Sequence, residues 1–196
     1  METSIESLQN QNSHNDIGVR NTNKEIIIVS GSSGLIGSAL IHKIASQYRL
    51  AGLDNAGYPY PPAEAECVCL DITTDESVKF AFERIRYEYG NKISSVIHLA
   101  AYYDFLGKPS PLYDEITVKG TERLIKHLQG FEVEQFIFSS SMLIYKPTLP
   151  GKKINEEWPL EPKWDYPKSK VATEKILHEQ RGKIPVVLMR MAGVYS

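Results

Sequence analysis

The sequence predicts an α/β fold in which a doubly wound parallel sheet forms the centre of one domain. Short apolar runs alternate along the 196 residues with segments whose apolar residues recur at helical spacing, a pattern typical of strand–helix–strand units. A glycine-rich turn stands between the first apolar run and the first helical segment. Because connections between parallel strands are right-handed, we expect helices on both faces of the sheet.

The first predicted strand, Glu25–Ser30 (EIIIVS), is a continuous β-branched run, typical of a strand buried on both faces. Five more apolar runs predict strands at Arg49–Leu53, Glu66–Leu70, Ser94–Leu99, Gln135–Ser140 and Ile184–Arg190. Helical periodicity predicts helices over Leu35–Ile44, Asp75–Tyr89, Pro111–Gln129 and Tyr166–Arg181. The proline-rich segment Gly57–Pro62 is expected to be a loop.

The composition argues against several classes of protein. A net charge of −2 and a pI near 6.2 give no electrostatic reason to expect nucleic acid or an anionic membrane as a partner. No stretch approaches the roughly 18 consecutive apolar residues of a membrane span. The polar segment Met1–Asn23 lacks the apolar run of a secretory signal, and we expect it to be a disordered tail. Residues 24–196 are expected to form one domain of a cytoplasmic protein.

The two cysteines, Cys67 and Cys69, are separated by one residue. On a strand this spacing directs both side chains to the same face, too close along one chain to form a disulfide readily. The spacing matches neither a CxxC redox motif nor a zinc-binding pair. We therefore expect two small buried apolar side chains, and no bound metal.

A glycine motif follows the first predicted strand. Gly31, Gly34 and Gly37 have GxxGxxG spacing between a strand and a helix. In this context the first glycine permits a tight turn, the second lets the backbone approach a diphosphate, and the third lets the helix pack closely on the sheet. No Lys-Ser or Lys-Thr pair follows, which argues against a P-loop NTPase. The motif predicts a Rossmann dinucleotide site, with phosphates at the helix N-terminus.

Two acidic residues follow later strands. Asp54 ends the second strand, close to the ~20-residue offset at which a carboxylate binds the adenosine ribose. A carboxylate there repels a 2′-phosphate, so the sequence favours NAD over NADP. Asp71, just after the third strand, is a weaker candidate for contact with the adenine.

Tyr166 and Lys170 are four residues apart, so their side chains lie next to each other on one helix face. Such a pair means little by itself. Its position, at the start of the helix after the fifth strand and downstream of a nucleotide motif, makes it a candidate reactive pair.

The sequence resembles the extended short-chain dehydrogenases/reductases, the NAD-dependent epimerase/dehydratase family, over nearly everything from Lys24 onward. Each motif is weak alone, and the specificity comes from their order and spacing. The matching motifs are Gly31-Ser-Ser-Gly34-Leu-Ile-Gly37, Asp54, Asp71-Ile72, His98-Leu99-Ala100-Ala101, Gly120-Thr121, Ser139-Ser140-Ser141, Tyr166-Pro167-Lys168-Ser169-Lys170 and Arg190.

The resemblance implies three catalytic residues. Tyr166 would be the general acid/base, Lys170 would bind the nicotinamide ribose and lower the pKa of the tyrosine, and Ser141 would orient the substrate oxygen. It also implies that NAD is bound by Gly31, Ser33, Gly34, Leu35, Ile36, Gly37, Asp54, Asp71, Ile72, Leu99, Ala100, Ala101, Tyr166 and Lys170.

Other polar and aromatic residues have less definite roles. His98 ends its strand and is interpreted as structural, and Tyr145 is not our choice of acid/base. The aromatic residues Tyr102, Tyr103 and Phe105 follow the fourth strand, where they would either line a substrate pocket or pack within the loop.

The sequence departs from the family pattern at three places. Thr117 stands where an asparagine is frequent, so a helix-bending or proton-relay role there is doubtful. Met142 and Leu143 follow Ser141 where sugar dehydratases of this family have an Asp-Glu pair, which argues against a dehydratase. The chain ends at Ser196, directly after the sixth strand, so we expect the C-terminal substrate domain to be largely missing.

The leading hypothesis is an NAD-dependent epimerase, dehydrogenase or reductase that acts on a hydroxyl or ketone carbon of a small molecule such as a nucleotide sugar. The alternative is a non-catalytic NAD-binding module, or a truncated, inactive fragment. By analogy with the family, the helices Pro111–Gln129 and Tyr166–Arg181 are expected to form a homodimer interface.

Overall fold

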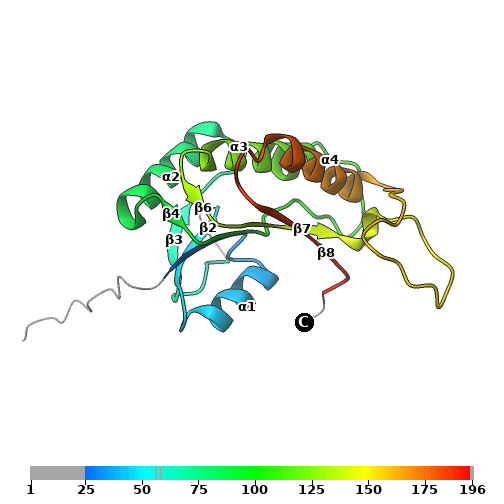
Figure 1. The fold of residues 1–196 in the computed structure, drawn as a ribbon, viewed down its shortest axis with the longest axis horizontal. Helices are drawn as coiled ribbons and strands as arrows, with labels where there is room; N and C mark the ends of the chain where they lie inside the picture. The colour runs from blue at the N-terminus through cyan, green and yellow to red at the C-terminus, as the bar shows by residue number, and fades with distance from the viewer. Residues whose placement is uncertain (1–24, 56, 58, 195–196) are drawn as a thin grey trace, which may run out of the picture.

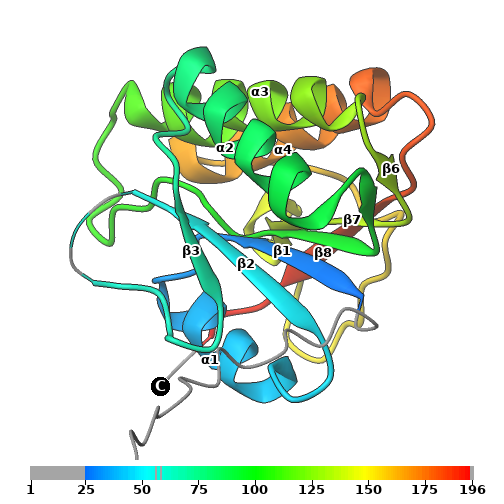
Figure 2. The same ribbon diagram turned by 90° about the vertical axis from the view of Figure 1, so that its left-hand side faces the viewer.

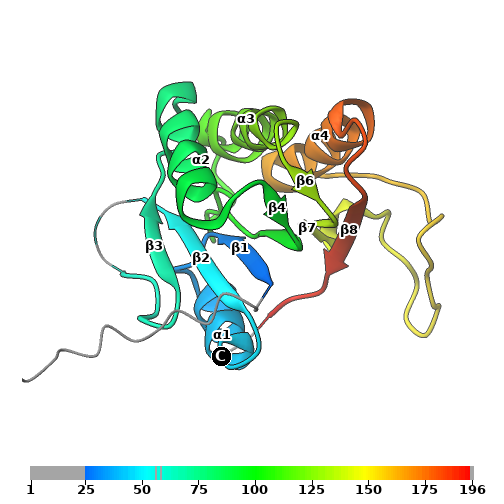
Figure 3. The same ribbon diagram turned by 60° about the vertical axis from the view of Figure 1, so that its left-hand side comes forward.

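A computed structural model describes residues 25–55, 57 and 59–194. The expected disordered tail, Met1–Asn23, lies outside these residues. A parallel sheet has the strand order β3-β2-β1-β5-β7-β8, with β3 and β8 at its two edges (Figure 3). Its strands are β1 (Ile26–Ser30), β2 (Arg49–Asp54), β3 (Glu66–Cys69), β5 (Ser95–His98), β7 (Phe136–Ser141) and β8 (Val186–Met191). The predicted doubly wound parallel sheet is confirmed, and strand ends differ from the predicted ones by one or two residues.

Helices cover both faces of the sheet, as predicted, but unequally (Figures 1 and 2). Helix α1 (Leu35–Ile44) lies alone on one face. On the opposite face lie α2 (Asp75–Tyr89), α3 (Lys119–Leu128) and α4 (Asp165–Gln180). The larger apolar core lies under these three helices, and a smaller one lies under α1. No helix in the described part of the chain is long and apolar enough to cross a membrane.

The centre of the sheet determines where a ligand can bind. All five residues of β1 are buried, as expected for a strand covered on both faces. The chain runs from β1 outward to β2 and β3, then returns to the other side of β1 at β5. Ligands of open α/β sheets bind at such a reversal, beyond the carboxyl ends of the strands. Here that place lies between the ends of β1 and β5.

The helix predicted at Pro111–Gln129 is not a single regular helix. It consists of a π-helical turn, η1 (Tyr113–Val118), followed by α3. The Lys119 N–H donates to the Asp114 carbonyl, five residues back. The Thr117 carbonyl instead accepts the Thr121 hydroxyl at 2.6 Å, and the Thr173 hydroxyl, which donates mainly to the Ser169 carbonyl at 2.8 Å, lies 3.3 Å from it. Side-chain donors thus compete with the helical ladder at this point, which favours the widened turn.

The prediction that both cysteines are buried is wrong. Cys67 and Cys69 are exposed free thiols on β3, while Val68 between them is buried in the larger core. Because β3 is an edge strand, its face opposite α2 is not covered, and the two cysteines share that face.

Two short strands that the sequence pattern did not predict form a second sheet. β4 (Lys92–Ile93) pairs in parallel with β6 (Glu132–Val133), just before β5 and β7 begin. A 3₁₀ turn, η2 (Met142–Ile144), follows β7 directly. At the other edge of the main sheet, β8 has three exposed apolar residues, Val187, Leu188 and Met189.

Candidate active site

The glycine turn after β1 is built so that side chains are excluded. Gly31 has a φ of +73°, and a Cβ atom there would lie 2.8 Å from the backbone nitrogen of Ala100. At Gly37 a Cβ would lie 2.2 Å from the Gly31 carbonyl oxygen. These two glycines therefore permit the turn and the close packing of α1, as the motif predicts.

The N-terminus of α1 offers unpaired donors at the mouth of this turn. Gly34 is the exposed N-cap residue, no side chain caps the helix, and its first turn contains no acidic residue. The hydroxyl of Ser33 is buried and has no hydrogen-bond partner among the residues that the structure describes. Free N–H groups, the positive end of the helix dipole and an unpaired hydroxyl together suit a diphosphate.

Asp54 lies beside the glycine turn, at the end of β2. One carboxylate oxygen accepts the Ser33 N–H at 2.8 Å, and the other accepts the Asn55 N–H at 2.9 Å. The carboxylate is only half-buried, so it keeps capacity to accept ribose hydroxyls. Its negative charge disfavours a phosphate on the ribose, which agrees with the predicted choice of NAD.

A cavity of about 500 Å³ opens at the carboxyl ends of β1, β2 and β5. Eight of the predicted cofactor residues line it: Gly31, Ser33, Gly34, Asp54, Ile72, Leu99, Ala100 and Ala101. Other lining residues include Tyr102, Tyr103 and Ile116. Leu35, Ile36, Gly37, Asp71, Tyr166 and Lys170 are outside this lining. The cavity is therefore bordered by the glycine turn on one side and by the aromatic loop after β5 on the other.

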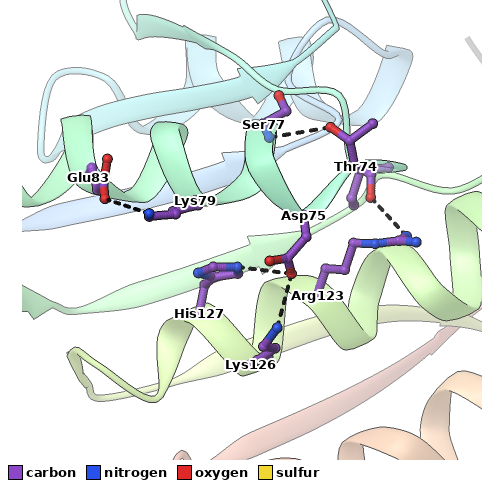
Figure 4. Close-up of polar contacts among 9 residues, drawn as sticks. Thr74, Asp75, Ser77, Lys79, Glu83, Arg123, Lys126 and His127 are labelled. Carbon is purple, nitrogen blue, oxygen red and sulfur yellow. Dashed lines mark hydrogen bonds and ion pairs between the residues drawn. The ribbon is translucent and has the colours of Figure 1, made fainter.

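The wall formed by Ile72 is fixed by helix α3. A Cβ on Gly120 would lie 2.9 Å from the Ile72 side chain, so this glycine allows the two to pack closely. The Arg123 guanidinium donates to the Ile72 carbonyl at 3.3 Å, reaching from α3 to the segment before α2 (Figure 4). Nearby, Asp75 of α2 accepts hydrogen bonds from Lys126 and His127 of α3 (Figure 4).

The Asp71 carboxylate forms its hydrogen bonds within its own turn. Its carboxylate accepts the backbone N–H and the hydroxyl of Thr73, at 2.9 and 2.6 Å. The Thr73 hydroxyl is the main reason that the pKa of this exposed carboxyl is lowered. The predicted contact of Asp71 with adenine therefore remains a prediction, whereas its neighbour Ile72 lies in the wall of the cavity.

The three predicted catalytic residues come together from two elements. Ser141 is the last residue of β7, and Tyr166 and Lys170 lie on consecutive turns of α4. The Ser141 side chain lies close enough to the Tyr166 phenol to lower its pKa. The Lys170 ammonium donates to the Ser139 carbonyl at 2.7 Å and lies 5.6 Å from the centre of the Tyr166 ring.

The protonation of the pair differs from the expectation for the cofactor-bound state. Burial raises the pKa of Tyr166, and the nearby Ser141 side chain opposes this effect. Burial also lowers the pKa of Lys170 to about 7, against the pull of Glu174. A partly discharged lysine that is bonded to a carbonyl does little to stabilise a phenolate. The expected lowering of the tyrosine pKa by Lys170 is thus absent from this structure.

An aromatic cluster surrounds Tyr166. The Tyr103 ring meets it edge-on with centroids 4.8 Å apart, and the buried Tyr113 ring lies at 6.4 Å. Tyr102 packs against Tyr113, while Phe105 packs against Tyr103 and is 92% exposed. Sequence reasoning missed Tyr113, because its position in an expected regular helix did not indicate that it faces Tyr166.

Two other expectations agree with the geometry. His98 is completely buried, with both ring nitrogens bonded to hydroxyl groups, as a structural residue would be. The Tyr145 hydroxyl accepts from Arg190 at 2.6 Å, and Arg190 also forms an ion pair with the buried Glu174 at 2.7 Å. Sequence reasoning did not predict this ion pair. It joins α4 to β8 close to the predicted catalytic residues.

The sheet, the glycine turn and the serine–tyrosine–lysine group define a nucleotide-binding domain of the short-chain dehydrogenase/reductase class. A model of the NAD dependent epimerase/dehydratase family matches residues 27–196. The chain belongs to this family, and NAD is the cofactor that the family uses.

Curated relatives share the family and extend beyond the chain. The chain is 28% identical to the human dTDP-D-glucose 4,6-dehydratase over 186 residues, which are 87% of the chain and 51% of that protein. It is 26% identical to UDP-glucose 4-epimerase 2 of Oryza sativa subsp. japonica, covering 78% of the chain and 40% of that protein. The chain thus spans about half the length of the curated relatives it matches.

A solved structure has the same fold. The UDP-glucose 4-epimerase of Thermus thermophilus, in complex with NAD, superposes with a TM-score of 0.72. Its sequence is 27% identical, and the match covers 84% of this chain and 54% of the epimerase. The Rossmann fold predicted from the sequence is therefore confirmed by comparison as well as by strand order.

Proposed function

We propose that this chain binds NAD in the cavity at the carboxyl ends of β1, β2 and β5 and carries the catalytic group of an epimerase, dehydrogenase or reductase. One observation carries the proposal: Ser141, Tyr166 and Lys170 converge beside that cavity. Tyr103 lines the cavity and also contacts the Tyr166 ring, so the reactive phenol adjoins the cofactor site.

Different residues in and beside the cavity would bind different parts of NAD. The N-terminus of α1 and the Ser33 hydroxyl would bind the diphosphate, and Asp54 would accept the adenosine ribose hydroxyls. Lys170 would bind the second ribose, exchanging its contact with the Ser139 carbonyl for the ribose hydroxyls.

Tyr166 is the group that moves the proton. In the oxidative direction, its phenolate takes the hydroxyl proton of the substrate while the same carbon gives up a hydride, and in the reverse direction the phenol returns the proton. NAD, when bound, supplies the hydride acceptor. Ser141, whose side chain lies close to Tyr166, would donate to the substrate oxygen and orient it between the two hydroxyls.

The substrate is proposed to be a nucleotide sugar or a similar small molecule. Two relatives are named for sugar nucleotides, UDP-glucose and dTDP-D-glucose. Elimination of water has less support, because Met142 and Leu143 occupy the exposed η2 turn after Ser141, where dehydratases of this family have acids. Epimerisation and simple oxidation or reduction remain alternatives. The cytoplasmic location also remains a prediction.

The proposal is tested by measuring binding and turnover separately. Calorimetry with NAD should show saturable binding to both the wild type and Tyr166→Phe, since the variant changes only the phenol. Production of NADH from NAD with UDP-glucose, and epimerisation of UDP-glucose, should occur with the wild type and fall at least about 100-fold in the variant. Wild-type NAD binding without any turnover would support a non-catalytic NAD-binding module. Absence of NAD binding would overturn the proposal.

A further inference from the structure

A chain of largely buried hydrogen bonds runs from Ala100 in the wall of the proposed NAD cavity through Ser30 and His98 to Thr121 of α3. Ser30, the residue before the glycine turn, pairs in register with His98 at the ends of β1 and β5. The Ser30 hydroxyl lies 2.5 Å from His98 Nδ1, and the Thr121 hydroxyl of α3 lies 2.8 Å from Nε2. All three residues are completely buried.

The positions of the hydrogen atoms follow from the partners. The Thr121 hydroxyl donates to the Thr117 carbonyl at 2.6 Å, so its only proton is already used. Its oxygen must then accept a proton from His98 Nε2. In a neutral ring Nδ1 is consequently an acceptor, and Ser30 donates to it.

The chain continues to the wall of the cavity. With its proton directed at His98, the Ser30 oxygen accepts the Ala100 N–H at 3.5 Å. Every bond from Ala100 to Thr117 thus points in one direction, so each donor polarises the next. Ala100 lines the cavity. A Cβ on Gly31 would lie only 2.8 Å from the Ala100 nitrogen, so the glycine turn and Ala100 cannot move closer together.

The surroundings favour the neutral ring. Phe136 and Phe138 of β7 pack on His98, each with ring centroids 5.8 Å away. Burial lowers the pKa of His98 to about 3, and the charge of Lys170 on α4 acts in the same direction. Ser30 and Thr121, from β1 and α3, carry no charge. The ring therefore stays neutral throughout the physiological pH range.

We propose that His98, as the neutral Nε2–H tautomer, is a positioning residue that sets the spacing between the glycine turn and the Ala100–Ala101 wall of the NAD cavity. This inference rests on the proposed function, because it takes the cavity to be the NAD site. It assigns a common role to Ser30, His98 and Thr121. The sequence motifs included His98, which was interpreted only as structural, and Thr121, which was given no role.

The tautomer is tested by nitrogen-15 NMR of the histidine rings in the full chain. Between pH 5 and 8, His98 should show a protonated Nε2, an unprotonated Nδ1 and no titration. Assignment follows from loss of the signal in His98→Asn. A ring protonated at Nδ1, or one that titrates within this range, would overturn the inference whether or not NAD binds.

The positioning role is tested by NAD affinity. Thr121→Val removes the acceptor for His98 with little change of shape, and should weaken NAD binding about tenfold, whereas Thr121→Ser should restore binding. Ser30→Ala provides a second break in the chain, with the same expected loss. Ser95→Ala is the matched control, because this buried hydroxyl of β5 has no hydrogen-bond partner in the described part of the chain.

Measurements well below the unfolding temperature of each variant separate positioning from simple destabilisation. Unchanged NAD affinity in folded Thr121→Val and Ser30→Ala would overturn the positioning role while leaving the proposed function intact. If wild-type protein itself does not bind NAD, the proposed function fails, and the NMR result still decides the tautomer.

Discussion

Lys170 is an ammonium group placed where water cannot reach it. Its side chain is 1% exposed, donates to the Ser139 carbonyl, and lies over the rings of Phe138 and Tyr166. Burial opposes the charged form of lysine, which is why the pKa is lowered to about 7. Such a buried position is what the proposed contact of Lys170 with the nicotinamide ribose requires.

This burial predicts a dependence of stability on pH. Between about pH 7 and the ordinary lysine pKa of 10.5, the unfolded chain binds more protons at Lys170 than the folded chain does. The free energy of unfolding therefore rises with pH in this window, by at most about 1.4 kcal/mol per pH unit, and the cost of burial is greatest below pH 7. In urea denaturation, Lys170→Met should lack this rise and gain stability relative to wild type at pH 6.

The exposed Lys175 on the same helix supplies the control. Lys175→Met should keep the wild-type pH dependence, because this ammonium faces solvent and pairs weakly with Glu179. Parallel pH profiles for wild type and Lys170→Met would contradict the burial of a charged lysine.

At the residue scale, the sequence predicted a candidate reactive pair but not the surroundings of individual residues. Tyr166 and Lys170 were identified from their spacing and position, and the structure places them together with Ser141. The exposure of Cys67 and the contact of Tyr113 with Tyr166 were not predictable. Each depends on which distant element covers, or fails to cover, one side of a residue.

The start of α1 combines a glycine required for packing, Gly37, with an N-cap glycine, Gly34, that is proposed to bind the diphosphate. A Cβ on Gly37 would meet backbone at 2.2 Å, whereas one on Gly34 comes no closer than 3.4 Å to the Gly31 carbonyl. Gly34 also has extended backbone angles that any residue can adopt. The two glycines therefore serve different purposes, although they belong to one motif.

Alanine substitution should separate the two purposes. Gly37→Ala should lower the free energy of unfolding by about 2 kcal/mol or more, because helix and turn must move apart. Gly34→Ala should stay within about 0.5 kcal/mol of wild type yet bind NAD at least about tenfold more weakly, since its methyl group occupies the diphosphate site. Thermal unfolding and calorimetry measure the two effects. Normal NAD binding by Gly34→Ala would argue against a diphosphate at this helix.

At the element scale, regular segments were predicted more accurately than interruptions. Asp75–Tyr89 matches α2 at both ends, because Thr74 caps its start and Gly90 follows its end. The widened turn η1 was not predicted, since the Thr173 hydroxyl that bonds there comes from a helix 56 residues away along the chain. The apolar periodicity of a segment does not depend on hydrogen-bond donors elsewhere in the chain, so it cannot predict their effect.

On the scale of the whole molecule, α3 and α4 lie side by side across one face of the sheet (Figure 1). Gln180 of α4 donates to Glu122 of α3, and the buried hydroxyl of Thr173 bonds to the Thr117 carbonyl. The outer side of α4 presents the exposed Ala172 and the half-buried Ile176. A small and an apolar residue on the outer side of α4 would suit the packing of a second copy against this helix.

We therefore expect a homodimer, as the family resemblance implies. Light scattering should give a mass of about 44 kDa, twice the 22.1 kDa of one chain, and Ala172→Arg should halve it. Lys168→Glu, on the same helix, provides a control for a change of charge alone. A wild-type mass of one chain at micromolar concentration would contradict the dimer.

The sequence by itself determined the fold class and the nucleotide motif, and it predicted the reactive residues. These properties follow from local sequence patterns, because strand burial, helix periodicity and a glycine turn each depend on neighbours along the chain. The tertiary structure alone decided which groups are charged, which are exposed and which hydrogen bonds reach the wall of the cavity. Those properties depend on contacts between residues far apart in sequence, such as Ser30 with His98 and Thr121, and the protonation of a buried group depends on all of its neighbours.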